Sequence, residues 1–132
     1  MQRLELNPTL GIPIYRQVMD QIREQIAAGK LRTGDQLPSI RDLSTELRIN
    51  PTSTVKAYNE LRHLGLIVQD QGRGTFVGAT RDAAEKDRND LLRREADVYV
   101  ARAINWGFPT TQVKSAVDRA LARHGRGKKH EE

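Results

Sequence analysis

The chain has 132 residues, room for one domain with an appendage, and no cysteine, which excludes disulfides, thiolate nucleophiles and cysteine-ligated metal sites. Its 22 Lys and Arg against 17 Asp and Glu give a net charge of +5, which is compatible with a polyanionic partner without indicating one. Because no apolar run has transmembrane length and no signal-peptide layout opens the chain, we expect a cytoplasmic protein with no membrane partner.

The first quarter of the chain predicts an arm, a helix and a loop. Residues 1–12 are mixed in character and are expected to form an extended arm. Pro13 suits the first turn of a helix, and Gly29 is expected to cap its end. The apolar stripe of this helix consists of Ile14, Val18, Ile22 and Ile26. Residues 30–36 are predicted to form a loop.

Two short helices with strong start signals follow. Ser39 begins the first, with Asp42 three residues later as a weak capping box, and Asn50 with Pro51 begins the second, which ends at Gly65. The side chains expected to point inward are Ile40, Leu43 and Leu47, then Ala57, Tyr58, Leu61 and Leu64.

The remaining elements are two strands and two helices. The runs 66–68 and 75–77 are strand-like, with a turn over 70–74 between them. A charged helix is expected over 81–105, a break over 106–109, and a last helix with a stripe of Val113, Ala116, Val117, Ala120 and Leu121.

This order predicts an α+β fold: an N-terminal winged helix-turn-helix followed by a short two-helix C-terminal dimerisation segment. The predicted parts are a DNA-binding domain over 1–78, a dimerisation segment over 79–123 and a disordered polar tail over 124–132.

Small polar and basic side chains gather where such a fold meets double-stranded DNA. Helix N-termini and their first turns reach base edges and phosphates, and a glycine-bracketed arginine suits a wing that enters a minor groove. The candidate DNA-binding residues are Ser39, Arg41, Arg48, Thr52, Ser53, Thr54, Lys56, Arg73 and Gly74. The alternatives are ordinary capping, a solvated lysine, a surface ion pair of Arg41 with Asp42 or Glu46, and a plain hairpin.

The chain offers no pattern for catalysis, metals or cofactors. His63, His124 and His130 are too scattered for one metal site, no loop resembles a phosphate-binding loop, and no nucleophile has a base and an orienting group beside it. We therefore expect neither an enzyme nor a cofactor.

The two C-terminal helices cannot bury their apolar stripes within one short chain, so a second copy is expected to cover them. The candidate dimerisation residues are Leu91, Leu92, Val98, Tyr99, Trp106, Val113, Val117 and Leu121. Trp106 and Phe108 are expected to pack the corner between the helices; a ligand pocket at Trp106 is the alternative, and no pattern identifies a small-molecule effector.

The chain resembles the GntR family of bacterial transcriptional regulators, and within it the short YtrA-like subfamily. The resemblance covers residues 12–123 and is carried by the runs Pro13–Gln17, Gly29–Leu31, Gly34–Leu43, Asn50-Pro51, Lys56–Tyr58, Glu60-Leu61, Gly65–Ile67 and Gly72–Val77. It implies a homodimer that binds an inverted-repeat operator, usually as a repressor of its own operon and of neighbouring transporter genes, often of the ABC type. It also implies DNA contacts from Arg41, Thr52, Ser53, Lys56, Arg73 and Gly74.

Two positions depart from the pattern of the subfamily. Its members often have asparagine where this chain has Thr52 and valine where it has Thr54. A polar side chain at core-facing position 54 is expected to loosen helix packing, and Thr52 to alter operator preference. A different class of function stays open at this stage: a winged-helix protein-interaction module without specific DNA binding.

Overall fold

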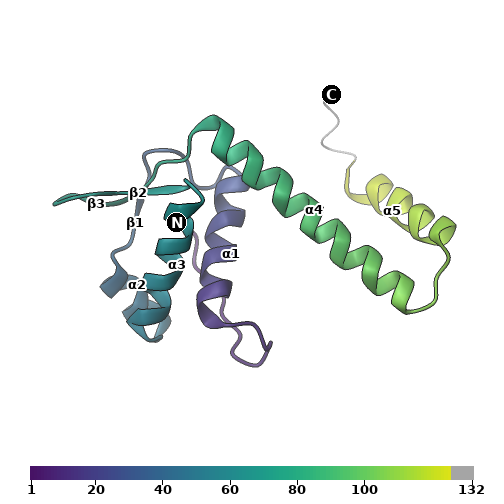
Figure 1. The fold of residues 1–132 in the computed structure, drawn as a ribbon, viewed down its shortest axis with the longest axis horizontal. Helices are drawn as coiled ribbons and strands as arrows, with labels where there is room; N and C mark the ends of the chain where they lie inside the picture. The colour runs from purple at the N-terminus through teal and green to yellow at the C-terminus, as the bar shows by residue number, and fades with distance from the viewer. Residues whose placement is uncertain (126–132) are drawn as a thin grey trace. The chain divides into compact units, whose positions relative to one another are not determined.

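The computed structural model describes residues 1–125, which form two compact units, Met1–Asn89 and the part of the chain from Asp90 onwards (Figure 1). The elements in chain order are α1 (Ile14–Ala27), β1 (Gln36–Leu37), α2 (Ile40–Leu47), α3 (Pro51–His63), β2 (Ile67–Asp70), β3 (Gly74–Val77), α4 (Arg81–Asn105) and α5 (Thr110–His124). The predicted α+β winged helix-turn-helix with two C-terminal helices is confirmed.

The core of the first unit lies where α3 packs against α1 and α2 and where the sheet covers the end of α3. Side chains from all of these elements are 2% exposed or less, and they include Val18, Ile22, Leu43, Leu61, Leu66 and Val77. Burial of such a cluster supplies most of the free energy that holds the helices in place. The expectation that Leu64 points inward is wrong, because this residue follows the last turn of α3 and is 41% exposed.

The three strands form an antiparallel sheet in the order β1-β3-β2. β2 and β3 pair from Ile67 opposite Val77 to Asp70 opposite Gly74, which makes the wing. β1 adds a short edge, with Gln36 opposite Phe76. The loop predicted over residues 30–36 is corrected at its end: residue 36 forms a strand, because β3, which lies far along the chain, supplies its partner.

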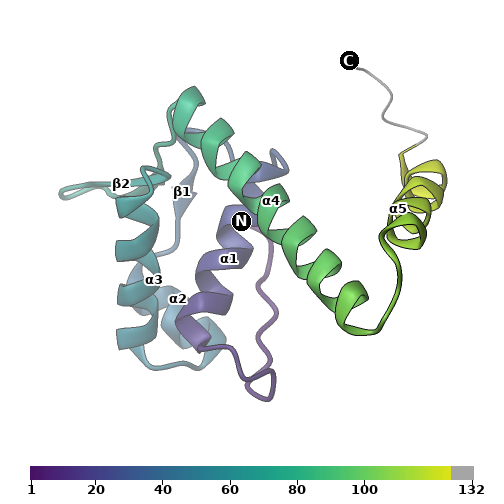
Figure 2. The ribbon, with the colours of Figure 1, turned by 45° about the vertical axis from the view of Figure 1, so that its right-hand side comes forward.

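The arm over residues 1–12 lies along α1, as Figure 2 shows. Gln17, Gln21 and Gln25 follow one another at intervals of four residues, so they share one face of the helix. Each accepts a backbone N–H of the arm and donates to the carbonyl of the same arm residue, at distances between 2.7 and 3.0 Å. The three pairs are Gln25 with Gln2, Gln21 with Glu5 and Gln17 with Asn7. The glutamine amides thus form the backbone hydrogen bonds that a neighbouring β-strand would otherwise form with the arm, and Leu4 of the arm is buried.

The first turns of α4 belong to the N-terminal unit because a buried ion pair joins them to α1. The Arg23 Nη2 and Nε atoms lie 2.7 and 3.1 Å from Asp87 Oδ1, and the two side chains are 6% and 7% exposed. Burial alone would lower the pKa of Arg23, but the hydrogen bond and charge of Asp87, together with Asp20, raise it above its ordinary value. The compact unit accordingly extends to Asn89, past the boundary at residue 78 that the sequence suggested.

The last helix, α5, is also longer than expected. α5 includes His124 and is capped by Gly125, so the prediction of a disordered tail is wrong for residue 124. The rest of that predicted tail, residues 126–132, lies outside the described residues.

Candidate nucleic-acid interface

The helix-turn-helix presents two capped helix starts to solvent. Ser39 Oγ accepts the backbone N–H of Asp42 at 3.0 Å, and Asn50 Oδ1 accepts that of Thr52 at 2.9 Å. Arg41, in the first turn of α2, and Pro51, in the first turn of α3, line one shallow depression together with Ser44 and Thr45. An exposed helix N-terminus is a favourable place for phosphate oxygens.

The first two turns of α3 expose the small polar and basic side chains that the sequence singled out. Thr52 and Lys56 are exposed and Ser53 is half-buried. The Lys56 Nζ atom lies 4.4 Å from the centre of the Tyr15 ring of α1. This cation–π contact holds the exposed ammonium group in place. An exposed contact of this kind is weak enough for a phosphate or a guanine edge to replace it.

The prediction that Thr54 contacts DNA is corrected, because its side chain has no exposed surface. Its hydroxyl lies 2.8 Å from that of Ser44, which lies 2.6 Å from the Ile40 carbonyl. Because the carbonyl can only accept, Ser44 donates to it and Thr54 donates to Ser44. The two hydroxyls thus join α3 to α2 with both protons used, and the expected loosening of the packing is absent.

The two arginines of the α2 region remain candidates for phosphate contact. Arg41 is exposed in the first turn of α2, where a cation opposes the helix dipole. No ion pair links it to Asp42 or Glu46 in the part of the chain that the structure describes. Arg48 is exposed at the end of α2, with a left-handed backbone (φ 57°) that turns the chain toward α3.

The wing carries Arg73 at its tip. This side chain is 75% exposed, and it forms an ion pair with the half-exposed Asp70 at 3.6 Å. Gly72 and Gly74 have φ values of 81° and 128°, which a residue with a side chain rarely adopts, and they close the turn tightly. An exposed ion pair of this length is worth little, so Arg73 can exchange Asp70 for a phosphate or a groove edge at small cost.

Arg62 and Gln36, which were not among the predicted site residues, form hydrogen bonds that support the wing. Arg62, near the end of α3, donates to Asn59 and to Gln69 of β2, which ties the helix to the wing. The Gln36 side chain of β1 donates to the Arg73 carbonyl at 3.1 Å. The Arg62–Gln69 and Gln36–Arg73 bonds have no local sequence signal, because their partners come from different parts of the chain.

The C-terminal unit exposes most of the side chains predicted to form a dimer. Trp106, Leu92 and Leu121 are 69%, 71% and 60% exposed. The predicted role of Val113 is corrected: it is only 8% exposed within this unit and has little surface left for a partner. Of the other candidates, Val98, Tyr99 and Val117 are exposed and Leu91 is half-buried.

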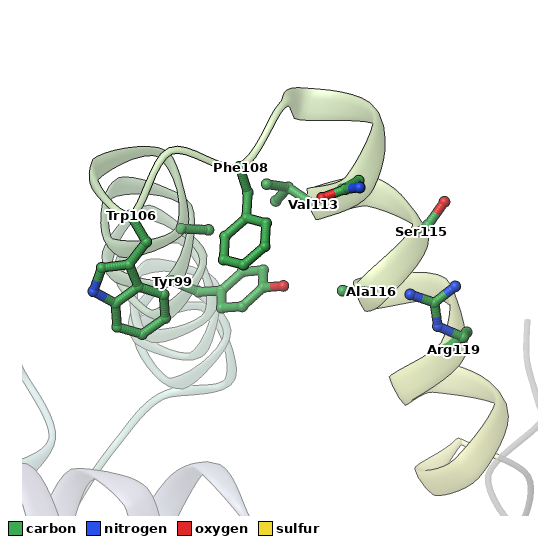
Figure 3. Close-up of a pocket in the computed structure, with 9 residues that line it drawn as sticks. Tyr99, Trp106, Phe108, Val113, Ser115, Ala116 and Arg119 are labelled. Atoms are coloured by element: carbon green, nitrogen blue, oxygen red, sulfur yellow. The ribbon is translucent and has the colours of Figure 1, made fainter.

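An open groove of about 450 Å³ lies between the end of α4 and α5. Tyr99, Trp106 and Phe108 supply aromatic rings to it, and Ala116 and Arg119 come from α5 (Figure 3). Trp106 and Phe108 lie between the two helices, but the expectation that they pack this corner is wrong, because they are 69% and 50% exposed and both line the open groove.

Residues 1–125 include no group of three or more acidic or histidine side chains placed to hold a metal ion. Within the same range, no helix combines the length and the apolar character needed to cross a membrane.

Comparisons with known proteins bear on this arrangement. The family model described as "Bacterial regulatory proteins, gntR family" matches residues 14–77. The transcriptional repressor YtrA of Bacillus subtilis is 39% identical over 74 residues, which are 56% of this chain and 57% of the repressor. The structure of YtrA from Sulfolobus acidocaldarius, a GntR-family transcription factor, is 36% identical, with a TM-score of 0.57 over 77% of this chain and 97% of that one. The chain belongs to the GntR family.

Two further solved structures are similar to this GntR-family protein. A GntR-family regulator from Listeria monocytogenes superposes with a TM-score of 0.75 at 26% identity, covering 86% of this chain and 98% of that one. The DNA-binding domain of AraR, solved in complex with operator ORX1, is 29% identical, with a TM-score of 0.52 over 59% of this chain and 100% of that one. The predicted family and its YtrA-like character are confirmed, and the family is one of DNA-binding transcriptional regulators rather than enzymes.

Proposed function

We propose that this GntR-family protein is a sequence-specific repressor that binds an inverted-repeat operator as a homodimer in the cytoplasm. The observation that carries the proposal is the combination of exposed capped helix starts, exposed α3 residues and an exposed wing arginine, on a fold that in AraR is solved on an operator. In this proposal the start of α3 reads base edges while Arg41, Arg48 and Arg73 hold the backbone and the groove.

The C-terminal unit supports the homodimer. Of the fifteen large hydrophobic side chains that are exposed in residues 1–125, nine lie there: Leu92, Val98, Tyr99, Val100, Ile104, Trp106, Phe108, Val117 and Leu121. An apolar surface of this size on a small unit marks an interaction site. A second copy supplies the same apolar surface in return, and a two-fold dimer places two equal helix-turn-helix units on the two halves of an inverted repeat.

The targets that we propose are the operon of the regulator itself and neighbouring transporter genes of the ABC type. The support for this choice is the likeness to the YtrA repressor, and the matched segment spans just over half of that protein.

Charge-removal variants test the assignment of the DNA surface. Lys56→Ala is expected to weaken binding by about 1–3 kcal/mol if Lys56 contacts a base. Arg73→Ala is expected to weaken binding and to lower the slope of log K against log salt by about one for each phosphate contact that is lost. Lys114→Ala is the matched control, because it removes the same charge from an exposed position on α5. Equal affinities for all three variants would overturn the proposed surface and favour a protein-interaction module.

The dimer is tested by sedimentation of the full chain. We expect a dimer at micromolar concentration, and a shift toward the monomer in Leu92→Ser, which replaces an apolar side chain that is 71% exposed. A monomeric wild-type protein at these concentrations would refute the homodimer.

A further inference from the structure

The Gln36 backbone lies at the edge of the sheet, beside the wing and some residues away from its tip. Its backbone is opposite Phe76 of β3, while its side chain extends toward the turn. There the Nε2 amide donates a hydrogen bond to the Arg73 carbonyl at 3.1 Å. This bond reaches the wing tip from outside the β2–β3 hairpin.

Gly74 leaves the space that this contact needs. A Cβ atom at position 74 would lie 2.6 Å from Gln36 Nε2, closer than two such atoms can approach. Gly74 also has a φ of 128°, which bends the strand at the point where the amide arrives. The glycine after Arg73 therefore serves two purposes: it closes the turn, and it admits the glutamine.

The backbone that carries Gln36 is itself firmly held. The Gly34 N–H donates to the Val77 carbonyl at 2.7 Å, and the Val77 N–H donates to the Asp35 carbonyl at 2.8 Å. Two residues after Gln36, the Pro38 carbonyl accepts the buried Tyr58 hydroxyl at 2.7 Å. Gln36 thus extends from a fixed segment that leads directly into α2, whereas the wing tip projects into solvent.

We propose that Gln36 is a positioning residue for the wing, which fixes the backbone at Arg73 and so directs the Arg73 side chain toward DNA. The inference rests on the proposed function, in which Arg73 contacts the operator. The bond is exposed, so it contributes little to the stability of the fold. Its effect is on the geometry of the wing, because the tip otherwise depends on its own turn, which the Arg73 N–H closes onto the Asp70 carbonyl at 2.9 Å.

A double-mutant cycle tests this role. The probe is a DNA duplex that the wild-type full chain selects from a random-sequence library, and the variant is Gln36→Met, which keeps the length of the side chain without its donor or any new charge. We expect Gln36→Met to weaken binding about threefold to tenfold, the range of one hydrogen bond. In the Arg73→Ala background the same substitution is expected to change affinity by less than about 1.5-fold, because the side chain that Gln36 positions is gone.

The control for the cycle is Arg41→Ala, a second charge removal outside the wing. In the Arg41→Ala background, Gln36→Met should keep its full effect on DNA affinity. The thermal unfolding midpoint of the Gln36→Met single variant should match that of the wild type. Unchanged affinity for Gln36→Met, or an undiminished effect in the Arg73→Ala background, would overturn the inference. Unchanged affinity for Arg73→Ala would instead overturn the wing contact in the proposed function, so the two failures are distinguishable.

Discussion

Asp87→Asn provides the sharpest test of how the structure accounts for stability. The substitution keeps the shape of the side chain but removes its charge. In the wild type, Arg23 donates to both Asp87 oxygens at 2.7 to 3.2 Å, and both side chains are at most 7% exposed. The asparagine Oδ1 could still accept the two bonds that Asp87 Oδ1 receives, but its Nδ2 donor would face Arg23 Nε in place of Asp87 Oδ2, and the buried guanidinium would lose the negative charge beside it.

The magnitude follows from the geometry of the pair. Breaking a buried ion pair by removing one partner costs about 3–5 kcal/mol. Asp20 Oδ1, 3.4 Å from Arg23 Nη1, retains part of the compensation, so we expect a loss near the lower end, about 3 kcal/mol. The matched control is Asp90→Asn, which breaks the pair with Arg93 on the same helix. Those side chains are 36% and 71% exposed, and an exposed pair is worth about 0–1 kcal/mol.

The assay is urea unfolding followed by circular dichroism, at one fixed protein concentration because dimerisation would add to the apparent stability. We expect a large drop in the free energy of unfolding for Asp87→Asn and almost none for Asp90→Asn. Equal losses for the two variants, or a loss below about 1 kcal/mol for Asp87→Asn, would refute the reasoning from burial.

Three further substitutions test the helix-turn-helix. Thr54→Val is expected to change stability by less than about 1 kcal/mol, since Ser44 still donates to the Ile40 carbonyl, and to leave DNA affinity unchanged; weaker DNA binding at equal stability would restore Thr54 as a contact. Tyr58→Phe should cost about 1–1.5 kcal/mol in thermal unfolding, because it leaves the Pro38 carbonyl without its donor, and an unchanged midpoint would contradict this. Asn50→Ala should cost about 1 kcal/mol through loss of the α3 cap, and a neutral result would show that the cap contributes nothing.

The helices could be predicted because their start signals are local. Ser39 and Asn50 cap helices as their positions suggest, and Pro51 occupies the first turn of α3. The order of these helices and the following hairpin sufficed to predict the winged helix-turn-helix. A capping side chain bonds a backbone N–H only two or three residues later, so both partners are visible in a short stretch of sequence.

Three of the features that sequence reasoning missed depend on partners outside their own helix or strand. β1 is too short to show a pattern and exists through its pairing with β3. The Arg23–Asp87 pair joins residues 64 positions apart. In the sequence, Thr54 is a polar residue near a helix start, which suggests a DNA contact. Its burial is explained by the hydrogen bond with the Ser44 hydroxyl of the preceding helix. The glutamines of α1 did carry a signal, a spacing of four residues on one helix face, which could have indicated a docked arm.

The central claim, a dimer that reads an inverted repeat, is tested most directly by selecting duplexes from a random-sequence library with the full chain and measuring the affinity of the enriched sequences by fluorescence anisotropy. The account predicts a two-fold symmetric sequence bound by one dimer, with affinity that falls steeply with salt and resists a scrambled competitor. Enrichment of no sequence, or binding equal to that of the scrambled duplex, would contradict it.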